Sequence, residues 1–379
     1  MDRIPGLLRR SVSFLREWSR FPANLRRLYA FLTDRRTASY LTDKALMKRK
    51  FRIWMDNLIW LLRHREVNEF YYLYQFDSRE PRDLSTYISY EDFRKLRDRI
   101  NFNRHLVAGR DYSILLRDKF VFNKYMESLQ LPVPPTVALI EQGCIRWAGA
   151  RDLASLDSLY DASRADISAY CKYVYGECGE KIYRLVKRKG QVLLDDRAVG
   201  KEELAATLKG TFFVQQEVRQ HPDLDEFYPL TTNTLRLYTV MTKKGPELFY
   251  GIMRFGANGN RVDNWAIGGI IIKLDLASGE LRPEGYFKPE YGGRVTAHPH
   301  TGRSFAGYRI PFFAEAAALV METHRYFYGI RHIGWDVAIT ATGPVIIEGN
   351  DNWEISVMQG LDRRGWKQWM YENSRPEPL

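Results

Sequence analysis

Two β-rich runs near the C-terminus, separated by a short turn, restrict the folds that are open to this chain. They lie in GWDVAITATGPVIIEGND, residues 334–351, and the residues between them are Ala341, Thr342 and Gly343. Small and polar residues between two such runs predict an antiparallel hairpin. Upstream, the β-rich runs NTLRLYTV, ELFYGIMRF and AIGGIIIKL are separated by Gly-containing turns. We therefore expect an antiparallel sheet that ends in this hairpin.

The polar residues of the hairpin are spaced for a shared ligand. Glu348 and Asn350 lie two positions apart, so in an extended strand both side chains project from one face. A turn near Thr342 brings Asp336 level with Glu348 on the neighbouring strand. Hard oxygen ligands of this kind suit Mg²⁺. An ordinary surface hairpin with solvated carboxylates explains the same residues equally well.

The rest of the chain mixes helical and β-rich segments. Helical spacing dominates residues 1–105, and the stretch RDKFVFNKYMESLQL, which begins at Arg117, predicts a helix that Pro132 and the prolines after it must end. Between Asp166 and Asp195, short β-rich runs are separated by the turn signals GECGE and RKG.

Three later segments complete this pattern. KEELAATLK predicts a helix, FFVQQEV predicts a strand, and a longer helix is expected from about Pro311 to Tyr328. The fold class is therefore α+β, with a helical N-terminal region, a small α+β lobe and a larger C-terminal lobe.

Composition excludes several classes of protein. The chain has 379 residues, of which 45% are hydrophobic, so it is long enough for two or three packed units. Its three cysteines are too few and too irregularly spaced for a disulfide framework or a paired zinc site. No apolar run is long enough to suggest a membrane span, and the N-terminus lacks the apolar core of a signal peptide. These features favour a cytoplasmic protein.

Positive charge is concentrated at the N-terminus. Residues 1–50 contain 13 Lys and Arg against four acidic residues, a net charge of 13 − 4 = +9, out of +11 for the chain. Helical spacing relates the apolar residues Ile4, Leu7, Leu8, Val12, Leu15 and Trp18. Such a basic amphipathic helix can adsorb to an anionic membrane at its inner face. It can equally be a solvated helix docked on the protein. Nucleic-acid binding is the weakest interpretation, because no recognised motif accompanies the charge.

A second pattern with chemical meaning lies in CKYVYGECGEKIYRL. Lys172 falls in a predicted strand, which is followed by a turn that contains Gly176 and Gly179. Glycines let backbone N–H groups approach phosphate oxygens, and a neighbouring lysine supplies positive charge. A plain hairpin with a surface lysine remains the alternative.

The order of these motifs along the chain resembles the ATP-grasp superfamily. The succession is RDK, a strand lysine with a glycine loop, QQEV, NTLR and a terminal D…ExN hairpin, over about residues 110–365. Within that superfamily the chain is similar to the sugar-transfer-associated ATP-grasp family, through RDKFVFNKYMESLQLPVPPT, VDNWAIGGI, HPHTG and IEGND. The resemblance implies an ATP-grasp fold of two α+β lobes. We expect residues 1–110 to form the basic helical region, residues 111–215 the small lobe and residues 216–379 the large lobe.

The resemblance also implies a site that binds ATP and Mg²⁺. Lys119 and Lys172 would contact the phosphates, and Gly176 and Gly179 would cover them. Gln216, Glu217 and Val218 would lie at the adenine. Asp225, or as the weaker choice Asp223, would bind the ribose. The metal would be held by Asp336, Glu348 and Asn350.

Two strand arginines are further catalytic candidates. The guanidinium groups of Arg236 and Arg254 suit a transferring phosphoryl group or a carboxylate, although arginines in strands are more often surface residues.

Other polar residues have plain structural explanations as well. Asp263 and Asn264, with Gly268 and Gly269, can shape an acceptor site or form a β-turn. His298 and His300 can bind substrate, but a proline-containing turn explains HPHTG better.

Three departures from the superfamily pattern concern the loop and the acceptor. Tyr173 follows Lys172 where the superfamily often has proline. Glu180 and Lys181 occupy a loop where small residues are common. Gly334 and Trp335 precede Asp336 without the arginine that some ligases place there. None of these differences affects the expected metal ligands.

The predicted function is a ligase in which a carboxylate attacks the γ-phosphate of ATP and an amine displaces the acyl phosphate to form an amide. The resemblance implies a role in the biosynthesis of cell-surface polysaccharides, with a glycan precursor as substrate. A kinase that phosphorylates a hydroxyl is the first alternative, and a non-catalytic scaffold bound to the membrane is the second.

Overall fold

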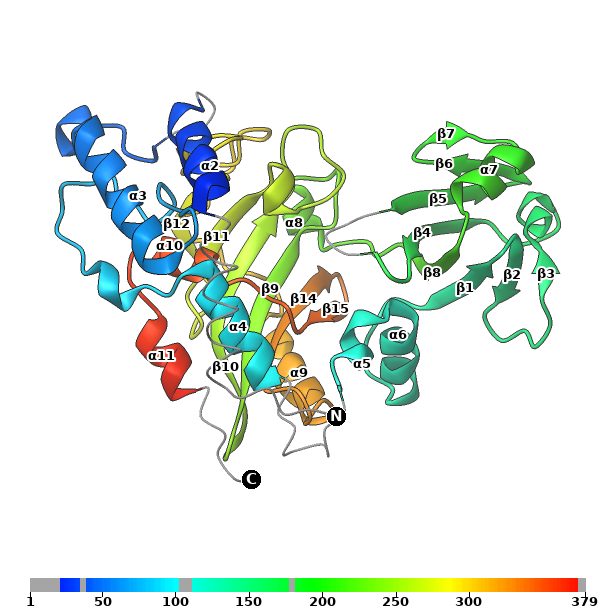
Figure 1. Ribbon diagram of the computed structural model, residues 1–379. Helices are drawn as coiled ribbons and strands as arrows, with labels where there is room; N and C mark the ends of the chain where they lie inside the picture. The colour runs from blue at the N-terminus through cyan, green and yellow to red at the C-terminus, as the bar shows by residue number, and fades with distance from the viewer. Residues whose placement is uncertain (1–20, 35–38, 102–110, 177–180, 374–379) are drawn as a thin grey trace, which may run out of the picture.

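Two antiparallel sheets organise the chain in space (Figure 1). The computed structural model describes residues 21–34, 39–101, 111–176 and 181–373. Within these residues the smaller lobe carries eight strands in the order β3-β2-β1-β8-β4-β5-β6-β7, and the larger lobe carries seven in the order β13-β12-β11-β10-β9-β14-β15. Every pairing between these strands is antiparallel, as the sequence predicts.

The strands of the two sheets follow each other along the chain. The small sheet consists of β1 Thr136–Glu141, β2 Cys144–Trp147, β3 Ala154–Ser155, β4 Ile167–Tyr173, β5 Ile182–Arg188, β6 Gln191–Leu194, β7 Arg197–Ala198 and β8 Thr211–Gln216. The large sheet consists of β9 Thr234–Thr242, β10 Gly245–Phe255, β11 Ile270–Leu274, β12 Leu281–Tyr286, β13 Arg294–Val295, β14 His332–Thr340 and β15 Gly343–Asn350. The chain passes from one sheet to the other after Gln216.

Helices surround the sheets. They are α2 Phe21–Thr33, α3 Lys50–His64, α4 Tyr90–Asn101, α5 Ile114–Arg117, α6 Lys119–Ser128, α7 Lys201–Thr207, α8 Pro222–Asp225, α9 Phe313–Arg325, α10 Ser356–Asp362 and α11 Lys367–Glu372. Short 3₁₀ helices cover Lys44–Leu46, Leu84–Thr86, Leu156–Tyr160 and Trp265–Ile267. Figure 1 shows the N-terminal helices α2 and α3 on the far side of the large sheet from the small one, whereas α4 lies in front of the large sheet.

Helix α6 illustrates how local sequence sets an element. Asp118 caps its N-terminus, accepting hydrogen bonds from the backbone N–H groups of Phe120 at 3.0 Å and Val121 at 2.9 Å. Such a cap stabilises a helix by about 1 kcal/mol. The helix ends at Ser128, and the prolines that follow lead into β1 in extended conformation. The predicted helix is therefore confirmed, although it ends at Ser128 rather than at the prolines.

The large sheet is covered on both faces. One core includes Trp335 and Val337 of β14 and Val320 of α9, and α5 and α6 add Leu116, Phe122 and Met126 to it. On the other face, Tyr238 of β9 and Tyr250 of β10 pack with Trp60, Tyr71 and Phe93 of the helical region and with Trp353. A third core lies within the small lobe, with Leu185 and Phe212 among its buried residues. Since burying one such side chain contributes about 1.5–3 kcal/mol, both covers of the large sheet fix its position strongly.

Most predicted elements are confirmed, and the differences have local causes. The elements that were not predicted are strands β1, β2, β3, β7, β12 and β13 and helices α5, α8, α10 and α11, because segments this short carry too few periods of apolar spacing. The amphipathic stripe from Ile4 to Trp18 lies outside the described residues. The boundaries proposed for the domains stay predictions. In the part of the chain that the structure describes, we find no helix that is both long and apolar enough to cross a bilayer.

Candidate active site between the two sheets

Three neighbouring strands bring the predicted metal ligands and one arginine together. Asp336 of β14 is paired with Glu348 of β15 on one side and with Arg236 of β9 on the other. Residues directly opposite each other in antiparallel strands project from the same face of the sheet. The register shifts by one residue after Asp336, which marks a β-bulge next to the acidic pair. The hairpin register predicted from the sequence is therefore confirmed.

A close approach of backbone to side chain fixes the end of β15. A Cβ on Gly349 would come within 2.9 Å of atoms of both Leu116 and Trp335. Trp335 is fully buried, and its indole nitrogen donates to the hydroxyl of Thr239 at 2.8 Å. Because these neighbours are packed, any larger residue between Glu348 and Asn350 would require them to shift.

Two arginines hold Asp336 in its charged form. An amino group of Arg236 donates to its Oδ2 atom at 2.8 Å, and an amino group of Arg254 lies 3.0 Å from the same atom. The Nε atom of Arg236 donates to Oδ1. Burial acts to raise the pKa of Asp336, but the two guanidinium groups outweigh it and hold the pKa well below its usual range.

Arg254 also connects Asp336 to a second buried carboxylate. Its NH2 atom donates to the hydroxyl of Thr234 at 2.6 Å, and its Nε atom lies 3.3 Å from Asp263. Asp263 accepts the backbone N–H of Thr234 at 3.0 Å. The structure thus places Asp263 beside the arginines, whereas Asn264 caps the short helix Trp265–Ile267 and Gly268 ends it with a φ of +98°.

Glu348 lies in a different electrostatic environment from Asp336. Burial raises its pKa, the neighbouring carboxylate of Asp336 raises it further, and Arg236 and Lys172 oppose both effects. The amide nitrogen of Asn350 donates to its Oε1 atom at 3.2 Å. Two adjacent carboxylates repel each other unless a cation lies between them, so this pair is suited to a divalent ion.

The residues present fit Mg²⁺. Glu348 and Asn350 have more oxygen positions free for a metal than Asp336 has. A carboxylate offers about four acceptor positions, and arginines occupy three on Asp336, so it has room for one bond to a metal. No cluster of three or more His, Cys, Asp or Glu residues suited to a metal occurs among the described residues. A magnesium site here would therefore combine two carboxylates with an amide oxygen and water.

Lys172 approaches this acidic pair from the small sheet. It lies in β4 between Ile182 of β5 and Phe213 of β8, and its ammonium group donates to the side-chain oxygen of Gln215 at 2.7 Å. Burial lowers the pKa of Lys172, the charge of Glu348 acts to raise it, and the charge of Lys119 acts to lower it. Charged groups of both sheets are thus close enough to act on each other.

Lys119 and the expected glycine loop meet at the start of α6. The ammonium group of Lys119 donates to the backbone carbonyl of Gly176, just after β4. Gly179 and Glu180 lie outside the described residues, and Lys181 follows them with a φ of +50°.

The segment expected to receive adenine lies where the chain leaves the small sheet. The backbone N–H of Gln216 donates to Pro135 and that of Glu217 donates to Ser168, both at 2.9 Å. The carboxylate of Glu217 accepts a bidentate pair from Arg184, at 2.8 and 3.0 Å. The carbonyl of Val218 accepts the hydroxyl of Thr232 at 3.3 Å. The side chain of Glu217 is therefore engaged within the small sheet.

Two other candidates are engaged elsewhere. Asp225 ends α8, is exposed, and accepts the side-chain amide of Gln220 at 2.7 Å. His298 is fully buried, with its Nε2 atom 2.8 Å from the carbonyl of Gly256, and its Nδ1 atom accepts the backbone N–H of His300 at 3.2 Å. This geometry agrees with the turn predicted for HPHTG.

The sequence did not reveal the groups that support the site. Gln215 links Lys172 to Asn123, whose side-chain oxygen accepts its amide at 2.8 Å. Arg117 forms a bidentate ion pair with Asp351, at 3.0 and 2.7 Å. Arg117 belongs to the motif RDK and Asp351 to the motif IEGND. These motifs were the sequence features from which the pair could have been predicted. Periodicity alone cannot pair residues so far apart in the chain.

Comparison with known proteins agrees with this architecture. The model of the family described as "Sugar-transfer associated ATP-grasp" matches residues 97–369. No curated protein matches the chain.

Similar solved structures include three enzymes. The ATP-grasp ligase PsnB in complex with its precursor peptide PsnA2 and AMPPNP is 10% identical, with a TM-score of 0.36 over 70% of this chain and 61% of the other. D-alanyl-alanine synthetase A from Vibrio cholerae is 11% identical, with a TM-score of 0.40 over 70% and 66%. Biotin carboxylase from Campylobacter jejuni is 10% identical, with a TM-score of 0.41 over 71% and 48%. The chain thus spans between about half and two thirds of the length of these structures.

Proposed function

This chain belongs to the sugar-transfer-associated ATP-grasp family, and on that premise we propose that it is an ATP- and Mg²⁺-dependent ligase that joins a carboxylate to an amine. The observation that carries the proposal is the convergence of Asp336, Glu348 and Arg236 on the large sheet with Lys172 on the small one. Opposed groups of this kind suit a nucleotide whose phosphates and metal lie between the sheets.

The proposed roles follow from the chemistry of each group. Lys172 and Lys119 would bind phosphate oxygens, with Gly176 and Gly179 closing over them. The backbone of Gln216, Glu217 and Val218 would meet the adenine edge, and Asp225 the ribose. Asp336, Glu348 and Asn350 would hold Mg²⁺, which when bound neutralises phosphate charge.

Arg236 and Arg254 would orient the reacting groups. Their guanidinium groups are already positioned by Asp336, Thr234 and Asp263, and a planar guanidinium can bind a carboxylate or a phosphoryl group by two parallel hydrogen bonds. Such pre-positioned charge lowers the barrier without reorganisation during the reaction.

The proposed reaction has two steps. An oxygen of the substrate carboxylate attacks the γ-phosphorus of ATP, the bond to the β-phosphate oxygen breaks, and ADP leaves with an acyl phosphate remaining. The nitrogen of the amine then attacks the acyl carbon, inorganic phosphate leaves, and the amine loses one proton.

The family description associates such chains with sugar transfer. On that basis we propose a role in the biosynthesis of cell-surface polysaccharides, with a glycan precursor that bears a carboxylate. A cytoplasmic enzyme that contacts the inner face of the membrane through residues 1–50 would meet such precursors. The charge of that segment supports the contact.

The test measures ADP release by the full chain with Mg²⁺, ATP, and a panel of uronic acids and amino acids. A ligase releases ADP only when a carboxylate and an amine are both present, and mass spectrometry detects a product lighter by one water than the two substrates together. Phosphate transferred to a hydroxyl with no amine present would instead establish a kinase. A chain that binds no nucleotide would favour the scaffold.

Glu141→Gln is the control variant for the site substitutions, because Glu141 is an exposed carboxylate at the end of β1.

A further inference from the structure

Helix α3 is apolar on the side that faces away from the protein. At 100° per residue, the outward arc of Lys50–His64 contains Phe51, Trp54, Met55, Leu58, Ile59 and Leu62. Phe51 is 74% exposed, Leu62 54% and Ile59 49%. A surface helix normally turns polar residues toward solvent and apolar ones toward the core. The outward face of α3 is apolar instead, so it requires an explanation.

The orientation of α3 is fixed by its opposite face. Trp60 and Leu61 are buried in the core beneath it, and Asp56 accepts Lys48 at 2.7 Å and the hydroxyl of Tyr71 at 3.1 Å. A rotation that buried Phe51 would expose Trp60 and break these polar contacts. The apolar arc therefore stays outside.

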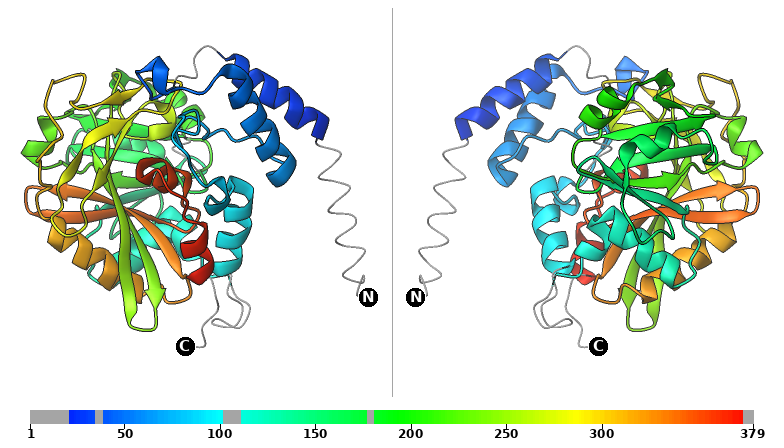
Figure 2. Two further views of the ribbon diagram at one scale, coloured as in Figure 1. Left: turned by 90° about the vertical axis from the view of Figure 1, so that its left-hand side faces the viewer. Right: turned by 90° about the vertical axis from the view of Figure 1, so that its right-hand side faces the viewer.

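Helix α2 extends this surface. Leu25 and Tyr29, one helical turn apart, are 44% and 71% exposed. The two helices are in contact, and the side-chain amide of Asn24 donates to the carbonyl of Arg65 at 2.9 Å. Both lie at the margin of the molecule, as Figure 2 shows. We call the exposed apolar residues of the two helices the α2–α3 face.

The segment that carries the α2–α3 face is rich in basic residues. Residues 21–65 contain 11 Lys and Arg and three Asp, a net charge of 11 − 3 = +8. Lys50 borders the apolar arc on one side, and Arg52 and Arg63 border it on the other. Exposed apolar side chains flanked by basic ones are typical of helices that lie in a membrane interface.

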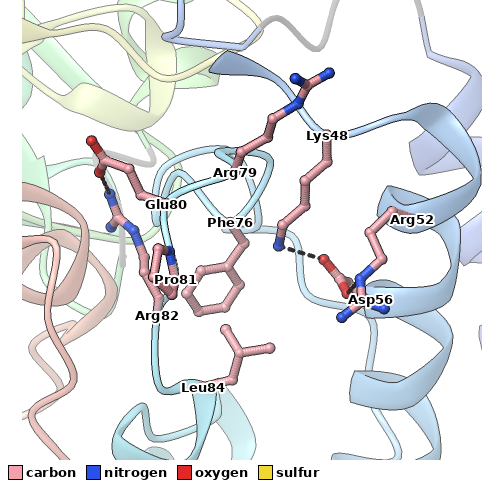
Figure 3. A pocket seen from close by; sticks show the side chains of 9 residues that line it. All are labelled: Lys48, Arg52, Asp56, Phe76, Arg79, Glu80, Pro81, Arg82 and Leu84. Carbon is pink, nitrogen blue, oxygen red and sulfur yellow. Dashed lines mark hydrogen bonds and ion pairs between the residues drawn. The ribbon is translucent and has the colours of Figure 1, made fainter. Parts of the chain in front are cut away.

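A cavity of about 430 Å³ adjoins the basic border of α3 (Figure 3). Phe76, Pro81 and Leu84 give it an apolar lining. Lys48, Arg52, Arg79 and Arg82 also line it with Asp56 and Glu80, so its charge is 4 − 2 = +2. An apolar lining with surplus positive charge suits the head of an anionic amphiphile.

We propose that the α2–α3 face docks on an anionic lipid bilayer, with the apolar residues of α3 in the interface and the basic residues on lipid phosphates. Three possible covers of this face differ in charge: residues 1–20, a second copy of the chain and an anionic bilayer. Residues 1–20 carry 5 − 2 = +3 and a second copy would present the same +8, so like charges oppose either as a cover. An anionic bilayer offers both the opposite charge and an apolar interior.

The arrangement is compatible with the ligase proposed above but does not depend on it. Figure 1 shows α3 on the far side of the large sheet from the small one, so docking there leaves the space between the sheets accessible. The new element is the position of the contact, in α3 rather than in the N-terminal segment up to Trp18.

The test is sedimentation of the full chain with vesicles of 70% phosphatidylcholine and 30% phosphatidylglycerol, at low salt. We expect binding to these vesicles and little to pure phosphatidylcholine. The double variant Phe51→Ser and Leu62→Ser should lower the partition coefficient by about tenfold or more, because two apolar groups leave the interface. Leu153→Ser with Leu230→Ser, at positions 54% and 46% exposed elsewhere, is the matched control and should bind normally.

A second pair of variants tests the charge. Lys50→Glu with Arg63→Glu should weaken binding by about tenfold or more, because each basic residue near the surface contributes about 1 kcal/mol. Arg188→Glu with Lys209→Glu makes the same change of charge on exposed positions of the small lobe and should have little effect. The midpoint of urea denaturation, measured on every variant, verifies the fold.

Three outcomes would overturn the proposal. The full chain could ignore anionic vesicles at low salt. The α3 variants could bind as well as the unchanged chain, which would place the contact in residues 1–20. Light scattering could show a dimer that only the Phe51 and Leu62 substitutions dissociate, which would make the face an interface between copies.

Discussion

The two carboxylates at the centre of the candidate site differ in charge balance, and this difference predicts the effect of removing one charge. Asp336 is compensated by Arg236 and Arg254, whereas burial and Asp336 both raise the pKa of Glu348. Glu348→Gln should lower Mg²⁺-dependent ATP turnover by about a hundredfold or more, because it removes charge from the metal ligand set. Its free energy of unfolding without ligand should not fall, since a repulsive charge is lost.

Turnover and urea denaturation measure these two effects separately. Glu141→Gln should leave both unchanged. If Glu348→Gln turns over ATP at a rate within a few fold of that of the unchanged chain, Glu348 is not a metal ligand.

Two lysines of the small sheet differ in what their ammonium groups contact. Lys172 faces the charged groups of the large sheet, whereas the ammonium group of Lys187 donates to the carbonyls of Arg164 at 2.6 Å and Ala165 at 3.1 Å. Lys172→Met should weaken binding of an ATP analogue by about tenfold or more, with a smaller loss of stability. Lys187→Met should instead cost about 1–3 kcal/mol of stability, because two hydrogen bonds from a charged donor are lost.

Calorimetric titration and urea denaturation of both variants check the contrast. If Lys172→Met unfolds more readily than Lys187→Met but binds the nucleotide normally, Lys172 is a structural residue.

At the level of elements, β15 depends on the contact between Gly349 and its buried neighbours. Gly349→Ala would place a Cβ 2.9 Å from atoms of Leu116 and Trp335. Overpacking of this kind costs about 1–3 kcal/mol. Gly293→Ala, where a Cβ meets nothing within 4 Å, should be nearly neutral. Urea denaturation compares the two, and equal stability would mean that β15 can shift away from the core.

The contact of α9 with the large sheet should be sensitive to acid. The hydroxyl of Thr239 lies 2.7 Å from Nδ1 of His324, and the Nε2 atom of His324 lies 2.8 Å from the carbonyl of Ile330, as suits a neutral ring. Burial lowers the pKa of His324 to about 4. The unfolded chain, with an ordinary pKa near 6.5, therefore binds the proton first, and stability is lost as pH falls from about 6.5 toward 4.

Between pH 7.5 and 5, His324 should account for a loss of about 2 kcal/mol in the free energy of unfolding. His324→Gln should be less stable at pH 7.5 but lose less on acidification. Denaturation curves at the two pH values measure the difference, and an equal loss in both proteins would show that His324 titrates normally.

For the whole molecule, a nucleotide between the two sheets should stabilise the fold. A ligand that binds only the native state contributes about 2.7 kcal/mol at 100 times its Kd. AMPPNP with Mg²⁺ should therefore raise Tm by a few degrees in a chain of this length. The rise should be smaller with EDTA and lost in Lys172→Met. An unchanged Tm at millimolar AMPPNP and Mg²⁺ would argue against the nucleotide site.

The sequence by itself determined the features that depend on neighbours along the chain. Two β-rich runs and a short turn specified the hairpin that pairs Asp336 with Glu348, and the stretch that begins at Arg117, with the prolines after it, specified α6. Strand period, helix capping and turn chemistry act over a few residues, so they can be read directly.

Only the tertiary structure decided which distant groups meet. Arg236 forms its ion pair with Asp336 from 100 positions away in the chain. Lys172 of the small sheet interacts electrostatically with Glu348 of the large sheet. The sequence likewise marks α3 as apolar but not which side the core covers. Burial of Trp60 selected that side, because packing against distant segments decides which of two apolar faces of a helix the core covers.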